Sequence, residues 1–506
     1  MAAWWWKLGP VNVLLCSFLL TVFSASPYYK QAPSTSDAPL VLLVSFDGFR
    51  WDYLDRNKTP SFDSFVRDGV KAKYLFDTFA SKTFPNHYTI ATGLYQESHG
   101  IVGNNMYNVS TGAKFTLRHK FNSSWWEGGE PIWVTNQNQG GHSGLIMYPG
   151  MEIQIRGQYP SYRLPKYNST FPYEERINIM TRLFANGSIN LGLLYFREPD
   201  HSGHMLGPNS PDMDAVIQMC DETLGYLMKK LRDAGLGDRV DVIVTSDHGM
   251  TPVSKDNFTQ LDDFVDPELY YYTDNNPVIG IWPHKESDVD VIYNKLQGAS
   301  PHVSVYLKDE IPAQYHYRDN PRIAPILLVA KEGWAIHVGN KTGSHFLNYK
   351  GNHGFNNSLM SMHPIFVARG PSFRQGLLVE PFENVNIYPL ICKILGLEPA
   401  PNNGSLENVQ DLLKYSELVT IMTTNEKGII TEPPPSTWST GTVIGIAVAG
   451  AILLVAACLL LAMCARQRSY RQQPREYTPI ADTSLEGVDE IADSGFSSYN
   501  YPNTKI

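Results

Sequence analysis

The chain has 506 residues, of which 18% are charged and 43% are hydrophobic, and both values are ordinary for a globular protein. Its formal net charge of -9 excludes the strongly basic surface that binding to nucleic acid requires. The length allows one large domain or two to three ordinary ones, because a single hydrophobic core stops growing at roughly 250 to 300 residues.

The N-terminus has the pattern of a secretory signal peptide. Lys7 precedes an apolar run, and the small residues Ser24, Ala25 and Ser26 follow it. The sequence therefore predicts that residues 1–25 are removed and that the remainder enters the secretory pathway.

Residues 26–422 are predicted to form one folded ectodomain. Residues 213–236 have apolar side chains at a spacing of three to four and a stop at Gly235, which indicates a helix. Four continuous apolar runs have the length and β-branching of strands buried on both faces, namely residues 39–46, 189–196, 240–246 and 324–330. The pattern predicts an α/β fold with a mixed β-sheet sandwiched between helices.

Acidic residues follow three of these predicted strands. Asp47 follows the first strand directly, and Asp200 comes four residues after the second. Asp247 and His248 follow the third. In open α/β sheets ligands bind beyond the carboxyl ends of the strands, so we expect these side chains to share one rim.

Two further histidines complete a candidate metal centre. His204 lies four residues after Asp200, a spacing at which both side chains reach one ion, whereas the adjacent His201 points elsewhere. His353 lies in the glycine-rich loop GNHGFNN. Taken singly, such residues are mostly caps or turns, but together they supply three carboxylates and three imidazoles. Mixed nitrogen and oxygen ligation favours zinc, so the sequence predicts two Zn²⁺ ions per chain.

The stretch SKTFPNHYT offers a nucleophile for that centre. Thr83 lies just ahead of Pro85 at an expected helix start, where backbone N–H groups face a bound anion. A threonine in this place is usually an N-cap, and the two roles are compatible. Its hydroxyl becomes a competent nucleophile when a metal ion lowers its pKa.

Three segments follow the ectodomain. Residues 423–442 form a linker rich in proline, serine and threonine. Residues 443–465 are an uncharged apolar run long enough to span a bilayer, and arginines directly after it place residues 466–506 in the cytosol. The sequence thus predicts a single-pass type I protein of the plasma membrane, with its folded part outside the cell and a disordered cytoplasmic tail.

Short patterns in the tail suggest partners there. Residues 477–480, YTPI, fit a tyrosine-based sorting signal that adaptors read, which implies endosomal cycling. The last three residues fit a PDZ-type ligand. Such patterns often occur by accident in disordered segments.

The positions of glycosylation sequons support an extracellular ectodomain, because every one lies before the predicted span. They begin at Asn57, Asn108, Asn122, Asn168, Asn186, Asn257, Asn340, Asn356 and Asn403. The ectodomain contains only two cysteines, Cys220 and Cys392, and the sequence leaves open whether they pair.

Five blocks of the sequence resemble the ectonucleotide pyrophosphatase/phosphodiesterases of the alkaline phosphatase superfamily. In order between residues 40 and 413, they are VSFDGFRWDYL, SKTFPNHYTIATGLYQESHGIVGNNMY, EPDHSGHMLGP, TSDHGM and GNHGFNNSLMSMHPIFVARGP. The chain looks most similar to the short type I members, numbered four and five, because it lacks the additional domains of the longer ones. The resemblance implies an alkaline-phosphatase-like fold.

The resemblance also implies roles for individual residues. The metal ligands would fall into two sets: Asp200, His204 and His353 for one zinc, and Asp47, Asp247, His248 and Thr83 for the other. Thr83 would be the nucleophile, and Asn104 would hold a phosphoryl oxygen. Phe84 and Tyr167 would sandwich a nucleobase.

The implied reaction is zinc-dependent hydrolysis of nucleotide phosphodiester or pyrophosphate bonds, as in NAD or dinucleoside polyphosphates. A covalent nucleotidyl-threonine would form and then release a 5'-nucleotide. Two alternatives stay open: cleavage of choline phosphodiesters or lysophospholipids, as in other members of the family, and a catalytically silent adhesion or receptor ectodomain. Loss of a metal ligand would indicate the silent ectodomain, and all six ligand positions are present.

Overall fold

A computed structural model describes residues 38–414 with the exception of positions 57, 275 and 340–348. The predicted signal peptide, linker, membrane span and tail lie outside these residues. Among the residues that are described, no helix is both long enough and apolar enough to cross a membrane.

The core of the fold is a mixed sheet of eight strands in the order β19-β2-β18-β9-β1-β8-β6-β7. Its strands are β1 (Leu40–Phe46), β2 (Val70–Ala72), β6 (Ser143–Ile146), β7 (Tyr162–Arg163), β8 (Leu191–Phe196), β9 (Val240–Thr245), β18 (Phe366–Arg369) and β19 (Leu377–Val379). β1 pairs in parallel with both β8 and β9, while β18 runs antiparallel to β9 and β2. Every residue of β1, β8 and β9 is buried, which confirms the three strands predicted from apolar runs.

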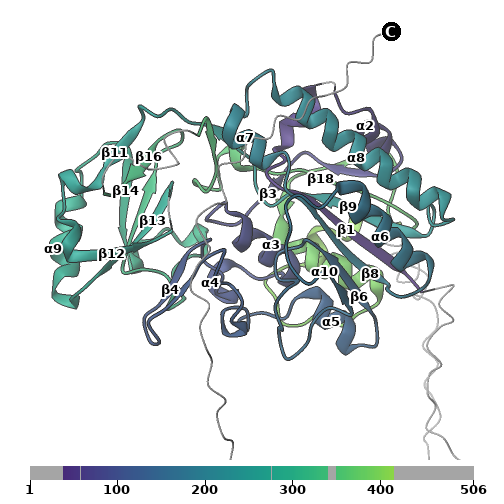
Figure 1. Ribbon diagram of the computed structural model, residues 1–506, viewed down its shortest axis with the longest axis horizontal. Helices are drawn as coiled ribbons and strands as arrows, with labels where there is room; N and C mark the ends of the chain where they lie inside the picture. Colours follow the sequence, from purple (N-terminus) through teal and green to yellow (C-terminus); the bar gives the residue numbers. More distant parts are fainter. Residues whose placement is uncertain (1–37, 57, 275, 340–348, 415–506) are drawn as a thin grey trace, which may run out of the picture. The chain divides into compact units, whose positions relative to one another are not determined.

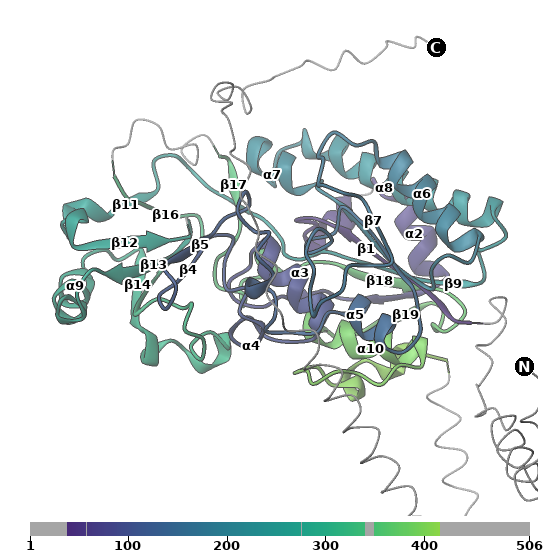
Figure 2. The same cartoon turned by 60° about the horizontal axis from the view of Figure 1, so that its bottom comes forward.

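Helices cover both faces of this sheet (Figure 1, Figure 2). One layer contains α2 (Pro60–Arg67), α6 (Tyr173–Ala185), α7 (Asp200–Leu206) and α8 (Met213–Asp233). The opposite layer contains α3 (Thr83–Thr92), α5 (Ile132–Asn138) and α10 (Ile387–Leu395), and the short α4 (Gln96–His99) adjoins α3. The predicted sandwich of a mixed sheet between helices is confirmed.

A second sheet has a smaller hydrophobic core of its own. Its four antiparallel strands are β12 (Tyr270–Thr273), β13 (Val278–Pro283), β15 (Ile326–Ala330) and β14 (Val303–Leu307), and α9 (Val289–Leu296) packs against β14. The run at residues 324–330 is therefore a strand, but its expected place in a parallel or mixed sheet is wrong. A continuous apolar run reports burial on both faces and does not report the direction of neighbouring strands.

Four two-stranded pairs lie outside the two larger sheets. They are β3 (Leu75–Phe76) with β20 (Phe382–Glu383), β4 (Met106–Asn108) with β5 (Ala113–Phe115), β10 (Thr251–Pro252) with β17 (Gly351–Asn352), and β11 (Phe258–Gln260) with β16 (Ala335–His337). Cys220 and Cys392 are both buried and free, which answers the question that the sequence left open.

Candidate metal centre and nucleophile

The three predicted acids meet at one rim of the large sheet. Asp47 follows β1 and Asp247 follows β9, while Asp200 begins α7 shortly after β8, so neighbouring parallel strands place all three together. The Asp200 amide donates to the Asp47 carbonyl at 2.9 Å. Gly48 has a φ of +66°, and a Cβ there would lie 2.8 Å from the Cβ of Asp200. Only glycine permits this close approach.

Asp200 and two histidines form one group of candidate ligands. His204 Nε2 lies 3.3 Å and His353 Nε2 lies 3.5 Å from Asp200 Oδ1. The other ring nitrogen of each histidine contacts a backbone carbonyl, that of Gly351 at 2.9 Å and that of Ser81 at 2.8 Å. A carbonyl at Nδ1 fixes the proton there and leaves Nε2 free to bind a metal. His201 is exposed, as expected for a residue outside the centre.

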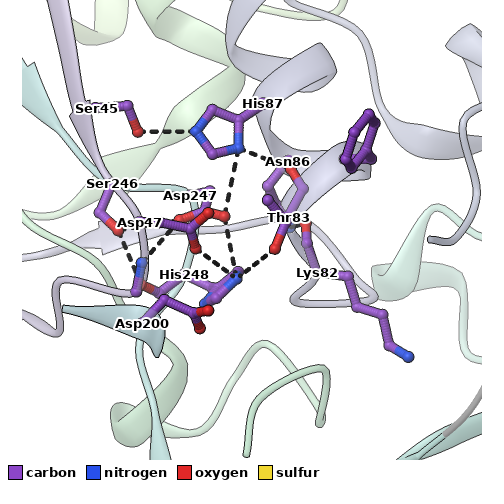
Figure 3. Close-up of polar contacts among 12 residues, drawn as sticks. Ser45, Asp47, Lys82, Thr83, Asn86, His87, Asp200, Ser246, Asp247 and His248 are labelled. Atoms are coloured by element: carbon purple, nitrogen blue, oxygen red, sulfur yellow. Dashed lines mark hydrogen bonds and ion pairs between the residues drawn. The ribbon is translucent and has the colours of Figure 1, made fainter. Parts of the chain in front are cut away.

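Asp47, Asp247 and His248 form the second group (Figure 3). His248 Nε2 lies 3.0 Å from Asp247 Oδ2 and 3.5 Å from Asp47 Oδ1, and His248 Nδ1 lies 2.9 Å from the Gly249 carbonyl. The ring of His248 stacks on that of His353 with centroids 3.5 Å apart. This stack joins the two groups into one cluster.

The cluster has the chemistry of a cation site. Asp47 Oδ1, Asp200 Oδ1 and Asp247 Oδ2 are buried and accept no hydrogen bond. Burial, and then repulsion from Asp247 and Asp200, raises the pKa of Asp47 well above its usual value. Buried carboxylate oxygens without partners are costly unless a cation neutralises them. The carboxylates and imidazoles present therefore fit zinc or a similar transition metal.

When the ligand atoms are grouped by the distances between them, His248 falls with Asp200 and His353 and not with Asp47 and Asp247. Ligand atoms of Asp200, His248 and His353 lie within 4.8 Å of one another, as do those of Asp47, His87 and Asp247. The stacked ring of His248 thus lies near both groups.

Thr83 is placed at this cluster by the start of α3. Its Oγ1 lies 3.3 Å from His248 Nε2 (Figure 3). The helix begins at Thr83 itself and Lys82 is the residue that precedes it, so the alternative in which Thr83 is the N-cap is wrong. The Thr83 hydroxyl is thereby free of a capping role and points toward the acids.

Asn104 reaches the same helix start from a different loop. Its Oδ1 accepts a hydrogen bond of 3.1 Å from the backbone N–H of Phe84. This contact uses the amide oxygen of Asn104 and ties its loop to the residue that follows Thr83. The expected role of Asn104 in holding a phosphoryl oxygen stays a prediction.

His87 is a residue of the site that the sequence reasoning missed. Its Nδ1 lies 2.8 Å from the Thr83 carbonyl and 3.4 Å from Asp247 Oδ2, and its Nε2 lies 2.9 Å from Ser45 Oγ. Burial lowers the pKa of His87, and its Nδ1 donates to the backbone carbonyl of Thr83. Its position four residues after Thr83 was a usable signal, because such residues share one helix face.

Phe84 and Tyr167 both lie beside Lys120. Lys120 Nζ lies 5.5 Å from the centroid of the Phe84 ring and 5.8 Å from that of Tyr167. Glu152 pairs with Lys120 at 2.8 Å and also accepts from the Tyr167 amide at 2.8 Å. Lys120 was absent from the predicted set, because a single lysine in a loop has no sequence pattern that indicates a site.

An α/β sandwich with an acid and histidine cluster at the carboxyl ends of its central strands, and a hydroxyl beside that cluster, defines a hydrolase of the alkaline-phosphatase-like class. Comparison with known proteins agrees. Residues 41–356 match the family model described as type I phosphodiesterase / nucleotide pyrophosphatase. The chain belongs to this family, and it is an enzyme that hydrolyses phosphodiester or phosphoanhydride bonds.

Several relatives match over most of their length. Human ectonucleotide pyrophosphatase/phosphodiesterase family member 5 is 44% identical over 403 residues, which cover 79% of this chain and 83% of the relative. A bis(5'-adenosyl)-triphosphatase of Xenopus laevis is 44% identical over 408 residues, covering 80% and 87%. Murine ectonucleotide pyrophosphatase/phosphodiesterase 5, solved as an inactive threonine-to-alanine variant with AMP, has a TM-score of 0.72 at 45% identity and covers 74% of this chain and 100% of its own.

Proposed function

We propose that this chain cleaves phosphoanhydride or phosphodiester bonds of extracellular nucleotides, such as dinucleoside polyphosphates or NAD, with Thr83 as a covalent nucleophile. The observation on which this rests is the Thr83 hydroxyl, 3.3 Å from His248 at a buried carboxylate cluster. The names of two relatives support it, since one is a bis(5'-adenosyl)-triphosphatase and another binds AMP and is inactive without a threonine.

Two Zn²⁺ ions would be held by the six acids and histidines of the cluster, with Thr83 as a further ligand. When bound, they lower the pKa of the threonine hydroxyl and neutralise charge that develops on phosphorus. The orphaned oxygens of Asp47, Asp200 and Asp247 support this assignment. The backbone carbonyls at the Nδ1 atoms of the three histidines hold each Nε2 toward the acids.

The side chains of this protein then perform two displacements at phosphorus. Thr83 Oγ1 loses its proton to solvent and attacks in line, so that the new O–P bond forms as the bond to the leaving phosphate or alcohol breaks. Asn104 Nδ2 donates to a non-bridging oxygen while its Oδ1 stays on the Phe84 amide. Water then attacks the same phosphorus from the opposite side, which releases a 5'-nucleotide such as AMP and restores the Thr83 hydroxyl.

The space between Phe84 and Tyr167 would receive the nucleobase. Both rings offer stacking surfaces, and Lys120 between them offers a donor for ring nitrogen or carbonyl acceptors. The presence of every predicted ligand argues against the silent adhesion or receptor ectodomain.

The proposed setting is the outer face of the plasma membrane, with a single type I span at residues 443–465 and cycling through endosomes. This rests on sequence patterns at residues 1–25 and 423–506, which lie outside the described residues. Antibody access to an ectodomain epitope on intact cells, and to a tail epitope only after permeabilisation, is the expected result.

A substrate panel tests the activity. Full-length protein, purified in detergent, is incubated with diadenosine triphosphate, NAD or glycerophosphocholine, and products are separated chromatographically. We expect AMP from the first two, and mass spectrometry of acid-quenched protein should place a nucleotidyl group on Thr83. Thr83→Ala should release no AMP, and Thr83→Ser should retain part of the activity. Release of phosphocholine without AMP would contradict the proposal.

A further inference from the structure

A buried ion pair lies directly behind the proposed nucleophile. Lys82 Nζ is 2.9 Å from Asp274 Oδ2, and the two side chains are only 4% and 10% exposed. Lys82 Nζ also donates to the Asn276 carbonyl at 3.1 Å. The side chain of Lys82 extends away from the carboxylate cluster (Figure 3).

The pair joins two parts of the fold that are remote in sequence. Lys82 precedes the first residue of α3, which is Thr83 itself. Asp274 directly follows β12, in the loop that connects β12 and β13 of the second sheet. The second sheet is therefore attached to the start of the nucleophile helix by an ion pair from which most solvent is excluded.

Two other loops of the site pack against the same ion pair. A Cβ on Gly103 would lie 2.9 Å from Asp274 Oδ2, and Gly103 immediately precedes Asn104. A Cβ on Gly354 would lie 2.8 Å from Lys82 Cε, and Gly354 immediately follows His353. The absence of a side chain at both glycines allows the loops bearing Asn104 and His353 to lie directly on the pair.

We infer that Lys82 and Asp274 are positioning residues, which fix Thr83, Asn104 and His353 relative to one another for the attack on phosphorus. The inference rests on the proposed role of Thr83 as the nucleophile. A buried ion pair is seldom needed for stability, because well-packed apolar residues of similar size are often as stable. A displacement of about 1 Å in a catalytic group, in contrast, lowers turnover by roughly 100-fold.

The test separates geometry from stability by removing one or both charges. Asp274→Leu leaves Lys82 without its carboxylate and should lower both the unfolding midpoint and kcat. The double variant Lys82→Met/Asp274→Leu has no uncompensated charge, so its midpoint should recover. Its kcat should nevertheless stay about 100-fold below wild type, with KM within about twofold and unchanged metal content.

Bis(4-nitrophenyl) phosphate is the substrate for this test, because it is a phosphodiester without a nucleobase. Its turnover by the full-length protein does not depend on which nucleotide is preferred. Failure of nucleotide cleavage by wild type, or turnover by Thr83→Ala, would refute the proposed function. Wild-type kcat in a stable double variant would refute the positioning inference alone.

A conservative variant and a matched control cover the case in which the double variant does not fold. Asp274→Asn keeps the shape and an acceptor oxygen, and it should lower kcat by about tenfold at unchanged KM. Asp241 is also buried, at 1% exposure, and accepts hydrogen bonds from Ser372 at the opposite end of β9. Asp241→Asn should lower stability and leave kcat unchanged. Equal kcat losses in these two variants, or none in Asp274→Asn, would refute the inference.

Discussion

Removal of the bound metal should lower the free energy of unfolding by several kcal/mol, because the carboxylates of the metal centre are buried. Asp47, Asp200 and Asp247 each bury an oxygen without a hydrogen-bond partner, and a bound cation would neutralise these oxygens. Each ion present at about 1,000 times its dissociation constant stabilises the folded state by about 4 kcal/mol, so two ions contribute about 8 kcal/mol. The unfolding entropy of a domain of this size is roughly 0.8 kcal/mol/K, which converts that loss to a fall in Tm of about 10 °C.

Differential scanning calorimetry of purified protein, with and without a chelator, measures this fall. Adding back Zn²⁺ should restore Tm, and elemental analysis should give about two ions per chain. Asp200→Asn should show a much smaller response to chelation than wild type. His316→Gln is the matched control, because His316 and Glu97 form an acid and histidine pair away from the cluster, 3.9 Å apart. A fall in Tm of less than about 2 °C on chelation of wild type would show that bound metal does not stabilise the buried carboxylates.

Three further predictions concern single side chains. Lys120→Gln should raise KM for nucleotides about tenfold, because one charge-assisted contact to the base is lost. Hydrolysis of bis(4-nitrophenyl) phosphate, which has no base, should not change. Equal effects on both substrates would contradict base binding between Phe84 and Tyr167. His87→Asn should lower kcat about tenfold at constant metal content, whereas loss of metal would show that His87 is itself a ligand. Burial lowers the pKa of His99 to about 3, so its contribution to stability is complete above pH ~6.5 and is lost as the pH falls toward 3. His99→Gln should flatten the acid side of the urea-unfolding profile by up to about 1.4 kcal/mol per pH unit, and an unchanged slope would contradict this.

The positions of the strands and of the acids that follow them could be predicted from local sequence. β1, β8 and β9 are continuous apolar runs, and Asp47, Asp247 and Asp200 follow them within a few residues. Since neighbouring parallel strands end at one rim, strand identity was sufficient to bring these acids together. An apolar run does not reveal which sheet a strand joins. β15 is such a run, but it pairs antiparallel with β13 and β14 in the second sheet.

Contacts between loops could not be predicted in this way. Lys120 reaches Phe84 and Tyr167, and Asp274 reaches Lys82, across sequence separations for which no periodicity or motif indicates a partner. Each of these contacts depends on how two independent loops pack against the sheet, which is a property of the whole fold.

The fold class and the acids that follow the central strands could be predicted from the sequence alone, because buried strands and the residues at their ends follow short-range rules. His204 and His353 were candidates on a four-residue spacing and on a glycine-rich loop. The folded structure was needed to show that Thr83 begins α3, that His87 contacts the cluster, and that Lys82 pairs with Asp274. These features depend on distances between atoms that are far apart along the chain, and side-chain packing of the complete fold sets those distances.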